Sequence, residues 1–326
     1  MAFIEAIDLV KTYSPKGSPE VRALDGLNLE VQQGSVTALL GPNGAGKTTT
    51  VKALTTLITP DSGSAFIDGV DVVADPQAIR RMIGASGQYA AVDQNLTGLE
   101  NLVMVGKLYH LGARVARQRA QELIELFDLV EAQNRTVKGY SGGMRRRIDL
   151  AGALVIRPPV LFLDEPTTGL DPRSRLGLWE VIEQLVTDGT TVLLTTQYLE
   201  EADRLADSIS VIDNGRVIAK GTADELKASV GGLRVAVTVI DEAHIDAARG
   251  ILTRFGSGET AVLNGRTLVV PVQDGPKALA AIVSATAREG IGLHDAGMRR
   301  PTLDDVFLQL TGHAAETDEA ETESVA

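Results

Sequence analysis

The sequence contains no cysteine. Disulfide bridges and thiolate-bound metal ions are therefore excluded. Long apolar runs are missing as well: the longest unbroken one, Ala278 to Val283, is far shorter than the ~20 residues with which a helix crosses a bilayer. The beginning, MAFIEAIDLV, has no basic stretch ahead of its apolar residues, so it does not read as a secretory signal. We therefore expect a soluble chain that meets a membrane only through a partner.

Basic residues are scarce relative to acidic ones. The chain has 31 Lys and Arg against 43 Asp and Glu, which gives a formal net charge of −12. The last residues, 313–326, include five acidic residues and no Lys or Arg, a composition typical of a disordered, solvating tail. Acidic residues outnumber basic ones in the remainder too, so the charge argues against a nucleic-acid partner.

The 326 residues leave room for two domains. Three short apolar runs, at 36–41, 160–165 and 191–196, have the character of buried strands in a parallel sheet. With the helical stretches between them, they predict an α/β domain over residues 1–230. The segment from about residue 90 to 158 has apolar residues at helical spacing and almost no strand pattern, which indicates a helical insertion into this domain.

A second domain is expected after the glycine pair Gly231 and Gly232. Residues 233–312 read in order as strand, helix, hairpin, helix and strand, which is the β-α-β-β-α-β pattern of a ferredoxin-like α+β domain. We place its hairpin at Asn264–Gly265. Another hairpin is expected at Asn214–Gly215 in the first domain, because Asn-Gly suits a two-residue turn.

The stretch GPNGAGKT follows the first apolar run directly and matches the phosphate-loop pattern G-x-x-x-x-G-K-[ST]. Backbone N–H groups of such a loop cradle phosphates, while the lysine reaches the terminal phosphates and the hydroxyl binds Mg²⁺. The alternative is a plain glycine-rich turn, but a buried strand before the motif and a helix after it favour the phosphate loop. The candidate nucleotide-binding residues are Gly41, Pro42, Asn43, Gly44, Ala45, Gly46, Lys47, Thr48 and Thr49.

The run VLFLDEP ends in two carboxylates. Asp164 is placed to hold Mg²⁺ through water, and Glu165 to act as general base toward an attacking water. On its own the pattern is weak, since any strand end can carry two acids. The spacing from the phosphate loop fits the next-but-one strand of a parallel sheet, and it makes the pair the second half of a nucleotide site.

A third motif, SGGMRRR, begins a helix with Ser141, Gly142 and Gly143. A serine and glycine N–H groups at a helix N-terminus form an anion site, yet the chain's own phosphates are already held by the 41–48 loop. With these three motifs the chain resembles the ATP-binding subunits of ABC transporters. In that family the Ser-Gly-Gly segment closes on ATP held by the other copy of a head-to-tail dimer. Arg145 to Arg147 are interpreted as a solvated helix face.

The resemblance implies a RecA-like P-loop NTPase core that binds and hydrolyses ATP with Mg²⁺. It also assigns roles to three further residues. Tyr13 resembles the aromatic residue that stacks on adenine, Gln88 the glutamine that contacts Mg²⁺ and joins the core to the helical insertion, and Asp171 the loop that touches the other subunit. The alternatives are an ordinary strand-end tyrosine, a plain loop glutamine and a simple Asp-Pro turn.

Two departures from the family pattern narrow the resemblance. Tyr140 and Met144 flank Ser-Gly-Gly where leucine and glutamine are usual, and Gln197 stands where histidine is usual. Because glutamine cannot titrate near neutrality, we expect Glu165 to carry the hydrolytic chemistry and Gln197 to position the phosphate. These features, with RRPTLDDVFLQLTG at 299–312, resemble the daunorubicin-resistance type of ATP-binding subunit.

This narrower resemblance implies a drug or secondary-metabolite exporter with a separate multi-span permease. The chain would then be cytoplasmic and peripheral on the inner face of the membrane. The alternative is a non-transport ABC ATPase, such as a translation or DNA-repair factor. It is disfavoured because the sequence has a single phosphate loop and no room for a long coiled coil between Lys47 and Asp164. A small-molecule kinase would have no use for the Ser-Gly-Gly segment.

Overall fold

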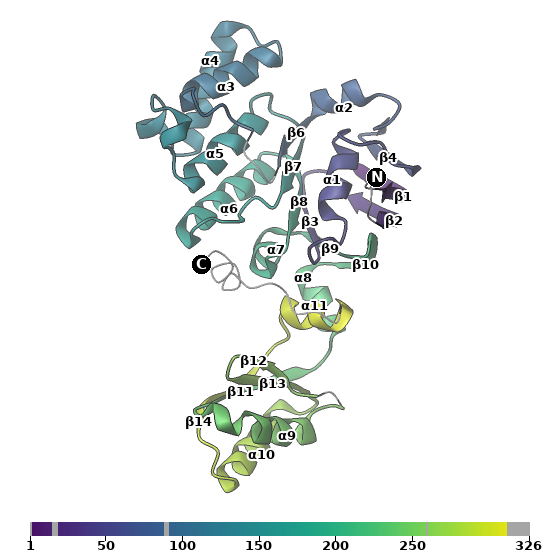
Figure 1. Ribbon diagram of the computed structural model, residues 1–326, viewed down its shortest axis with the longest axis vertical. Coiled ribbons are helices and arrows are strands. Elements are labelled where there is room, and N and C mark those ends of the chain that lie inside the picture. Colours follow the sequence, from purple (N-terminus) through teal and green to yellow (C-terminus); the bar gives the residue numbers. More distant parts are fainter. Residues whose placement is uncertain (1, 15–18, 88–90, 259, 312–326) are drawn as a thin grey trace. The chain divides into compact units, whose positions relative to one another are not determined.

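A computed structural model describes residues 2–14, 19–87, 91–258 and 260–311. The predicted tail at 313–326 and the candidate residue Gln88 lie outside these described residues. The chain divides into two compact units, one of described residues up to Ala223 and one that begins at Asp224 (Figure 1). Within the described residues, no helix combines the length and the apolar character needed to cross a bilayer.

The first unit is built around a six-stranded sheet in the order β10-β9-β3-β8-β7-β6. Its strands are β3 (Val36–Leu40), β6 (Ile83–Ser86), β7 (Val160–Asp164), β8 (Thr191–Thr196), β9 (Ser208–Asp213) and β10 (Arg216–Gly221). All neighbours run parallel except β10, which pairs antiparallel with β9. Every residue of β3, β7 and β8 is buried. The prediction of a mainly parallel sheet is confirmed, and β7 is indeed the next-but-one neighbour of β3.

A second sheet of this unit is antiparallel, in the order β2-β1-β4-β5. Its strands are β1 (Ile4–Tyr13), β2 (Val21–Val31), β4 (Ser62–Ile67) and β5 (Val70–Asp71). Their buried side chains share one core with Val51 and Leu54 of α1 (Lys47–Leu54) and with Leu39 and Phe162 of the parallel sheet. Burial of this apolar surface is the main force that holds the helix after the phosphate loop in place.

The region predicted as a helical insertion is mainly helical in its described residues. It contains α3 (Gly98–Leu108), α4 (Ala113–Leu126), two short 3₁₀ turns and α5 (Gly142–Ala153), and its described residues include no strand beyond an isolated bridge. The start of α3 is fixed by a capping box, in which Thr97 and Glu100 exchange side-chain and backbone hydrogen bonds. The helix α2 (Pro76–Met82) precedes β6.

The Asn214–Gly215 hairpin joins β9 to β10 as predicted. Both turn residues have positive φ, 47° and 75°, as a type I′ turn requires. The Gly215 N–H donates to the carbonyl of Ala45 at 2.9 Å, and the Gly215 carbonyl accepts from the N–H of Asp25 at 3.0 Å. The turn therefore braces the phosphate loop from behind.

The second unit has the ferredoxin-like strand order, β12-β13-β11-β14, with antiparallel neighbours throughout. Its elements are β11 (Leu233–Val239), α9 (Ile245–Phe255), β12 (Val262–Asn264), β13 (Thr267–Val272), α10 (Gly275–Arg288) and β14 (Leu293–Arg299). Ile251 of α9 and Ile282 of α10 pack against Val235 and Val237 of β11 to form its core. The predicted hairpin is present, with Asn264 paired to Thr267. Two flanking helices, α8 (Ala223–Ser229) and α11 (Leu303–Thr311), belong mainly to this unit.

Candidate nucleotide-binding site

The carboxyl ends of three neighbouring parallel strands define the site. Leu40 of β3 pairs with Thr196 of β8, and Thr195 of β8 pairs with Asp164 of β7. The residues that follow each strand are therefore brought to one edge of the sheet, namely the 41–48 loop, Gln197 and Glu165. In α/β proteins ligands bind outside this edge.

The phosphate loop requires glycine for steric reasons. Gly44 and Gly46 have φ of 81° and 111°, a region that side chains with a Cβ rarely adopt. A Cβ on Gly46 would also lie 2.6 Å from the Ala23 carbonyl oxygen, and one on Gly41 would lie 2.3 Å from the Ile212 carbonyl oxygen. The loop is thus packed tightly against its supports, with its backbone free of side chains where a phosphate would approach.

Lys47 lies inside the loop with only 4% of its surface exposed. Its Nζ donates to the carbonyl oxygens of Gly41 at 2.7 Å and Pro42 at 3.2 Å, and lies 3.9 Å from Oε1 of Glu165. The ammonium is therefore oriented by the loop itself, in a place where a phosphate oxygen would meet a shielded positive charge.

Asp164 is held by two threonine hydroxyls. Thr195 Oγ1 donates to its Oδ1 at 2.6 Å and Thr48 Oγ1 donates to the same oxygen at 3.1 Å. A carboxylate beside a threonine hydroxyl fits Mg²⁺, which commonly takes one or two protein ligands and completes its shell with phosphate oxygens and water. In the part of the chain that the structure describes, no cluster of three acidic or histidine side chains offers a metal site of its own.

Glu165 has a strained backbone. Its φ of 50° is unusual for a residue with a side chain, and such strain is typical of functional sites. The Glu165 N–H donates to both the carbonyl and the hydroxyl oxygen of Thr195 at 3.1 Å, and Thr168 Oγ1 approaches Oε2 at 3.4 Å. The carboxylate is thereby held close to Lys47.

Gln197 is buried, with 8% of its surface exposed. Its Oε1 finds no hydrogen-bond partner among the described residues. Leaving a buried polar atom unpaired costs about 1–3 kcal/mol, so such an atom calls for an explanation. One explanation is that Gln197 Oε1, at the carboxyl end of β8, accepts a hydrogen bond from a bound group.

Glu201 is a residue that the sequence analysis missed. It lies in α7 (Leu199–Leu205) and is fully buried, and its Oε1 accepts from Trp179 Nε1 at 3.1 Å. Burial raises the pKa of Glu201, and the hydrogen bond from Trp179 offsets only part of this effect. The signal in the sequence was an acidic residue four positions after Gln197.

The Ser141–Gly143 segment is exposed at the start of α5. Ser141 caps the helix by accepting from the Met144 N–H at 3.3 Å. Gly143 lies against α6 (Pro172–Thr187), where a Cβ on it would be 2.8 Å from Ser174 Oγ. Ser174 in turn donates from its hydroxyl to Asp171 at 2.6 Å, and this bond lowers the pKa of Asp171. The Ser-Gly-Gly segment and Asp171 are therefore neighbours on the surface of one chain.

Tyr13 ends β1 with 37% of its surface exposed. It pairs with Val21 of β2, two residues from Ala23, which supports Gly46. Lys11 Nζ lies 6.0 Å from the centroid of its ring.

The interpretation of Arg145 to Arg147 as a solvated helix face is wrong. Arg146 is buried, and neither neighbour is fully exposed. Arg145 donates to the Lys138 carbonyl at 3.0 Å, while Arg147 lies 3.8 Å from Asp128. Three consecutive residues of a helix spread over about 200° of its circumference, and here the middle one points inward.

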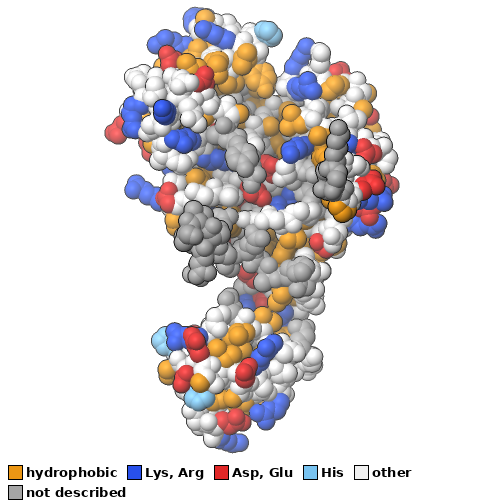
Figure 2. Space-filling model, in the orientation of Figure 1, with side chains coloured by type: hydrophobic (Ala, Val, Ile, Leu, Met, Phe, Trp, Pro, Cys, Tyr) orange, Lys and Arg blue, Asp and Glu red, His pale blue; other side chains and the backbone are white. Residues whose placement is uncertain are grey.

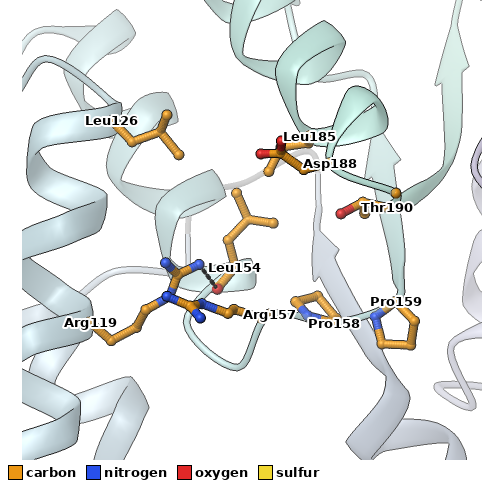
Figure 3. A pocket seen from close by; sticks show the side chains of 10 residues that line it. Arg119, Leu126, Leu154, Arg157, Pro158, Pro159, Leu185, Asp188 and Thr190 are labelled. Atoms are coloured by element: carbon orange, nitrogen blue, oxygen red, sulfur yellow. Dashed lines mark hydrogen bonds between the residues drawn. The ribbon is translucent and has the colours of Figure 1, made fainter.

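A separate cavity of about 440 Å³ lies at the opposite, amino ends of β7 and β8 (Figure 3). Arg119 and Arg157 reach into it, but their charges are used within the protein. Arg119 donates to the Leu154 carbonyl and to Glu122, both at 3.0 Å, and Arg157 donates to Glu122 at 2.9 Å. The cavity lies between the insertion and the amino ends of β7 and β8, and its two arginines are bound by neighbouring protein groups.

Comparison with known proteins agrees with this geometry. Residues 24–168 match the family model described as ABC transporter. The daunorubicin resistance ATP-binding protein DrrA2 of Streptomyces coeruleorubidus is 55% identical over 92% of this chain and 94% of its own length. The daunorubicin/doxorubicin resistance ATP-binding protein DrrA of Streptomyces peucetius is 48% identical over 99% of this chain and 96% of its own length. The chain belongs to the ATP-binding proteins of ABC transporters.

Within that family this chain is an ATPase of the daunorubicin-resistance group, as the sequence motifs predicted. A solved ATP-binding cassette, titled as a dimeric post-hydrolysis state bound to ADP and Pi, superposes with a TM-score of 0.62 at 27% identity. The superposition covers 67% of this chain and 98% of that one. The α/β P-loop fold of the first unit is thereby confirmed, and the family binds ATP.

Proposed function

We propose that the chain powers the export of a hydrophobic drug or secondary metabolite through a separate permease. The observation that carries this proposal is the similarity to daunorubicin-resistance proteins over nearly the whole length, second unit included. In these terms residues 1–230 are the ATPase domain, 233–312 an accessory domain and 313–326 a tail. The chain would lie on the cytoplasmic face of the membrane.

The site supports the following division of labour. N–H groups of the 41–48 loop and Lys47 bind the phosphates of ATP, and Thr48 and Asp164 hold Mg²⁺. When bound, the metal ion neutralises charge on the transferring phosphoryl group. Glu165 accepts a proton from the attacking water. Gln197 orients that water through its unpaired Oε1, which accepts a hydrogen bond, while its amide NH₂ can donate to the phosphate.

A direct test uses Lys47→Ala and Glu165→Gln. Loss of the ammonium should abolish tight ATP binding, because the loop then lacks its only side-chain cation. Glu165→Gln should bind ATP normally and hydrolyse it very slowly. Unchanged ATP affinity in the first variant, or wild-type turnover in the second, would contradict these assignments.

We further propose that two copies form the site together, head to tail, so that Ser141–Gly143 of one copy covers the phosphates held by the other. Support comes from the exposure of this helix N-terminus, which is suited to an anion. Gly142 offers a clean probe, since a Cβ there meets nothing within 4 Å. Gly142→Asp should fold normally and repel a phosphate brought by a partner.

The decisive experiment mixes Lys47→Ala with Gly142→Asp. If each site is shared, a mixed dimer has one site with both lesions and one intact site, so ATP turnover rises above that of either variant alone. If each chain holds a complete site, mixing restores nothing. Gly152→Asp is the matched control, because Gly152 lies on the same helix and its Cβ also meets nothing within 4 Å.

A surface of the helical insertion supports the permease as partner. An apolar groove of about 420 Å³ runs along α3, and Figure 2 shows apolar side chains gathered over this part of the insertion. The groove is lined by Leu96, Leu99, Val103, Met104 and Leu108, with Glu100, Lys107 and Arg117 at its rim. Such a groove suits a short amphipathic helix.

The partner is tested by isolating tagged Glu165→Gln protein from membranes with MgATP and identifying what co-purifies. A multi-span membrane protein that is lost with Val103→Glu supports the transport reading. Ribosomal or DNA-repair proteins would support the non-transport alternative instead. Drug accumulation in cells that carry wild-type or Glu165→Gln protein then tests direction: export predicts higher accumulation in the variant.

A further inference from the structure

One arginine of the insertion, Arg146, makes nearly all of its hydrogen bonds to backbone carbonyls at the carboxyl end of β7. Arg146, on α5, is 8% exposed. Its Nε donates to the Pro166 carbonyl at 2.8 Å, and its Nη2 donates to the carbonyls of Asp164 at 3.0 Å and Glu165 at 3.1 Å. Its Nη1 donates to the carbonyl of Gly87. One guanidinium therefore holds three successive peptides around Glu165 and a fourth at the end of β6.

An acid one turn further along α5 holds the adjacent segment. Asp149 lies 3.9 Å from Arg146, and it accepts from Ser86 Oγ at 2.6 Å and from the Ala91 N–H at 2.7 Å. Burial raises the pKa of Asp149 and lowers the pKa of Arg146, and their mutual attraction opposes both shifts. Burying such a pair costs several kcal/mol unless hydrogen bonds satisfy it, and here they do.

We propose that Arg146 and Asp149 form a clamp that positions Glu165 for ATP hydrolysis and ties it to the helical insertion. The strained backbone of Glu165 persists only if its surroundings hold it. Thr195 fixes its N–H from β8, and Arg146 fixes its carbonyl from α5. Thr195 and Arg146 are positioning residues, since they act through Glu165. The inference rests on the proposed role of Glu165 as general base.

The same contacts could serve only to stabilise the fold, and Arg146→Lys separates the two roles. An ammonium keeps the charge but cannot reach four carbonyls at once, as the planar guanidinium does. We expect ATP turnover per folded molecule to fall at least about tenfold, while ATP affinity changes less than about threefold, because the phosphate loop is untouched. Arg145→Lys is the matched control, since Arg145 lies on the same helix and donates to the Lys138 carbonyl, which belongs to the insertion and not to the peptides around Glu165.

A merely structural role would not make the effect of Arg146→Lys depend on Glu165, so this dependence is the deciding measurement. In a Glu165→Gln background, Arg146→Lys should cause little further loss of turnover, because the carboxylate that the clamp positions is already gone. Asp149→Asn keeps one acceptor oxygen for the Ala91 N–H, and its amide NH₂ can donate to the Ser86 hydroxyl, so it should fold well and lower turnover less. Combined with Arg146→Lys, it should add little to the loss.

Several results would overturn the clamp. They are wild-type turnover in Arg146→Lys, equal losses of affinity and turnover, or a full additional loss in the Glu165→Gln background. If Arg146→Lys fails to fold, wild-type turnover and melting temperature in Asp149→Asn would refute the clamp instead. Wild-type turnover in Glu165→Gln alone would instead refute the proposed role of Glu165, so the two failures can be told apart.

Discussion

The threonine at the end of β8 offers a sharp test of how Asp164 is held. Thr195 is fully buried, and its hydroxyl donates to Asp164 Oδ1 at 2.6 Å. Thr195→Val keeps nearly the same shape, so no cavity forms. The Glu165 N–H also remains satisfied, because it still donates to the Thr195 carbonyl. The substitution therefore removes one hydrogen bond to one carboxylate oxygen and one of the two acceptors of the Glu165 N–H.

A hydrogen bond to a charged group contributes about 1.5–3 kcal/mol. Thr48 still reaches the same oxygen at 3.1 Å, so we expect the free energy of unfolding to fall by about 2 kcal/mol. The freed carboxylate can also turn away from the Mg²⁺ position. ATP turnover should then fall by about tenfold, which corresponds to ~1.4 kcal/mol, and a higher Mg²⁺ concentration should restore part of it.

Urea unfolding gives the stability change, and turnover is measured across a Mg²⁺ titration. Thr191→Val is the matched control, because Thr191 is equally buried at the other end of β8. Its hydroxyl accepts from the Gly34 N–H at 2.9 Å, so its loss should lower stability without changing turnover. Equal turnover in the two valine variants would refute the argument that the Thr195 hydroxyl orients Asp164.

Three further predictions concern neighbouring contacts. Gly143→Ala places a methyl 2.8 Å from Ser174 Oγ; we expect turnover to fall several-fold with little change in melting temperature, and an unaffected turnover would contradict a functional role for this contact. Burial raises the pKa of Glu201, so the folded chain binds a proton there more tightly than the unfolded chain. The stability that this proton contributes is lost as pH rises from the ordinary pKa of 4.5 through the raised pKa of the folded chain. Glu201→Gln should remove that part of the pH dependence in denaturant titrations, and identical pH profiles would show that the group is not proton-linked to folding. Tyr140 donates its hydroxyl to the Ala132 carbonyl at 2.9 Å; Tyr140→Phe should lower the free energy of unfolding by about 1 kcal/mol, whereas an unchanged value would mean that water replaces the bond.

The phosphate loop could be predicted because its requirements are local. Positive φ at Gly44 and Gly46 and close packing at Gly41 demand glycine whatever the rest of the fold does. The ends of β7 and β8 could be predicted too, since an uninterrupted apolar run must be buried on both faces of a sheet. These features depend on a few adjacent residues, so they are visible in the sequence.

The sequence indicates strands at 27–31 and within 61–72, but the antiparallel sheet that they form with β1 escaped prediction for a physical reason. Register shifts interrupt the pairing of β1 with β2 between Ala6 and Leu9 and again near Lys11, so the alternation of buried and exposed residues breaks within the strand. A bulged strand does not show the period of two on which recognition depends.

The position of Arg146 escaped prediction because its partners are backbone carbonyls. Every residue has a backbone carbonyl, so the sequence does not distinguish one from another. Only the fold shows which carbonyls converge on one side chain. The same holds for Glu201, whose burial depends on Trp179 from a different helix. Side chains that recognise backbone, or that meet across elements, are the part of a site that motif reading leaves out.

The helix α5 connects the segment suited to a partner's phosphate with the backbone of Glu165. Its exposed N-terminus at Ser141 is the part suited to a partner's phosphate, and Tyr140, immediately before it, bonds to the insertion. Five residues beyond Ser141, Arg146 grips the peptides around Glu165, and Asp149 holds Ser86 and Ala91. A helix transmits displacement along its axis because its hydrogen bonds keep it rigid over a few turns. A partner that moves the insertion must therefore move the backbone of Glu165 as well, unless the clamp on α5 opens.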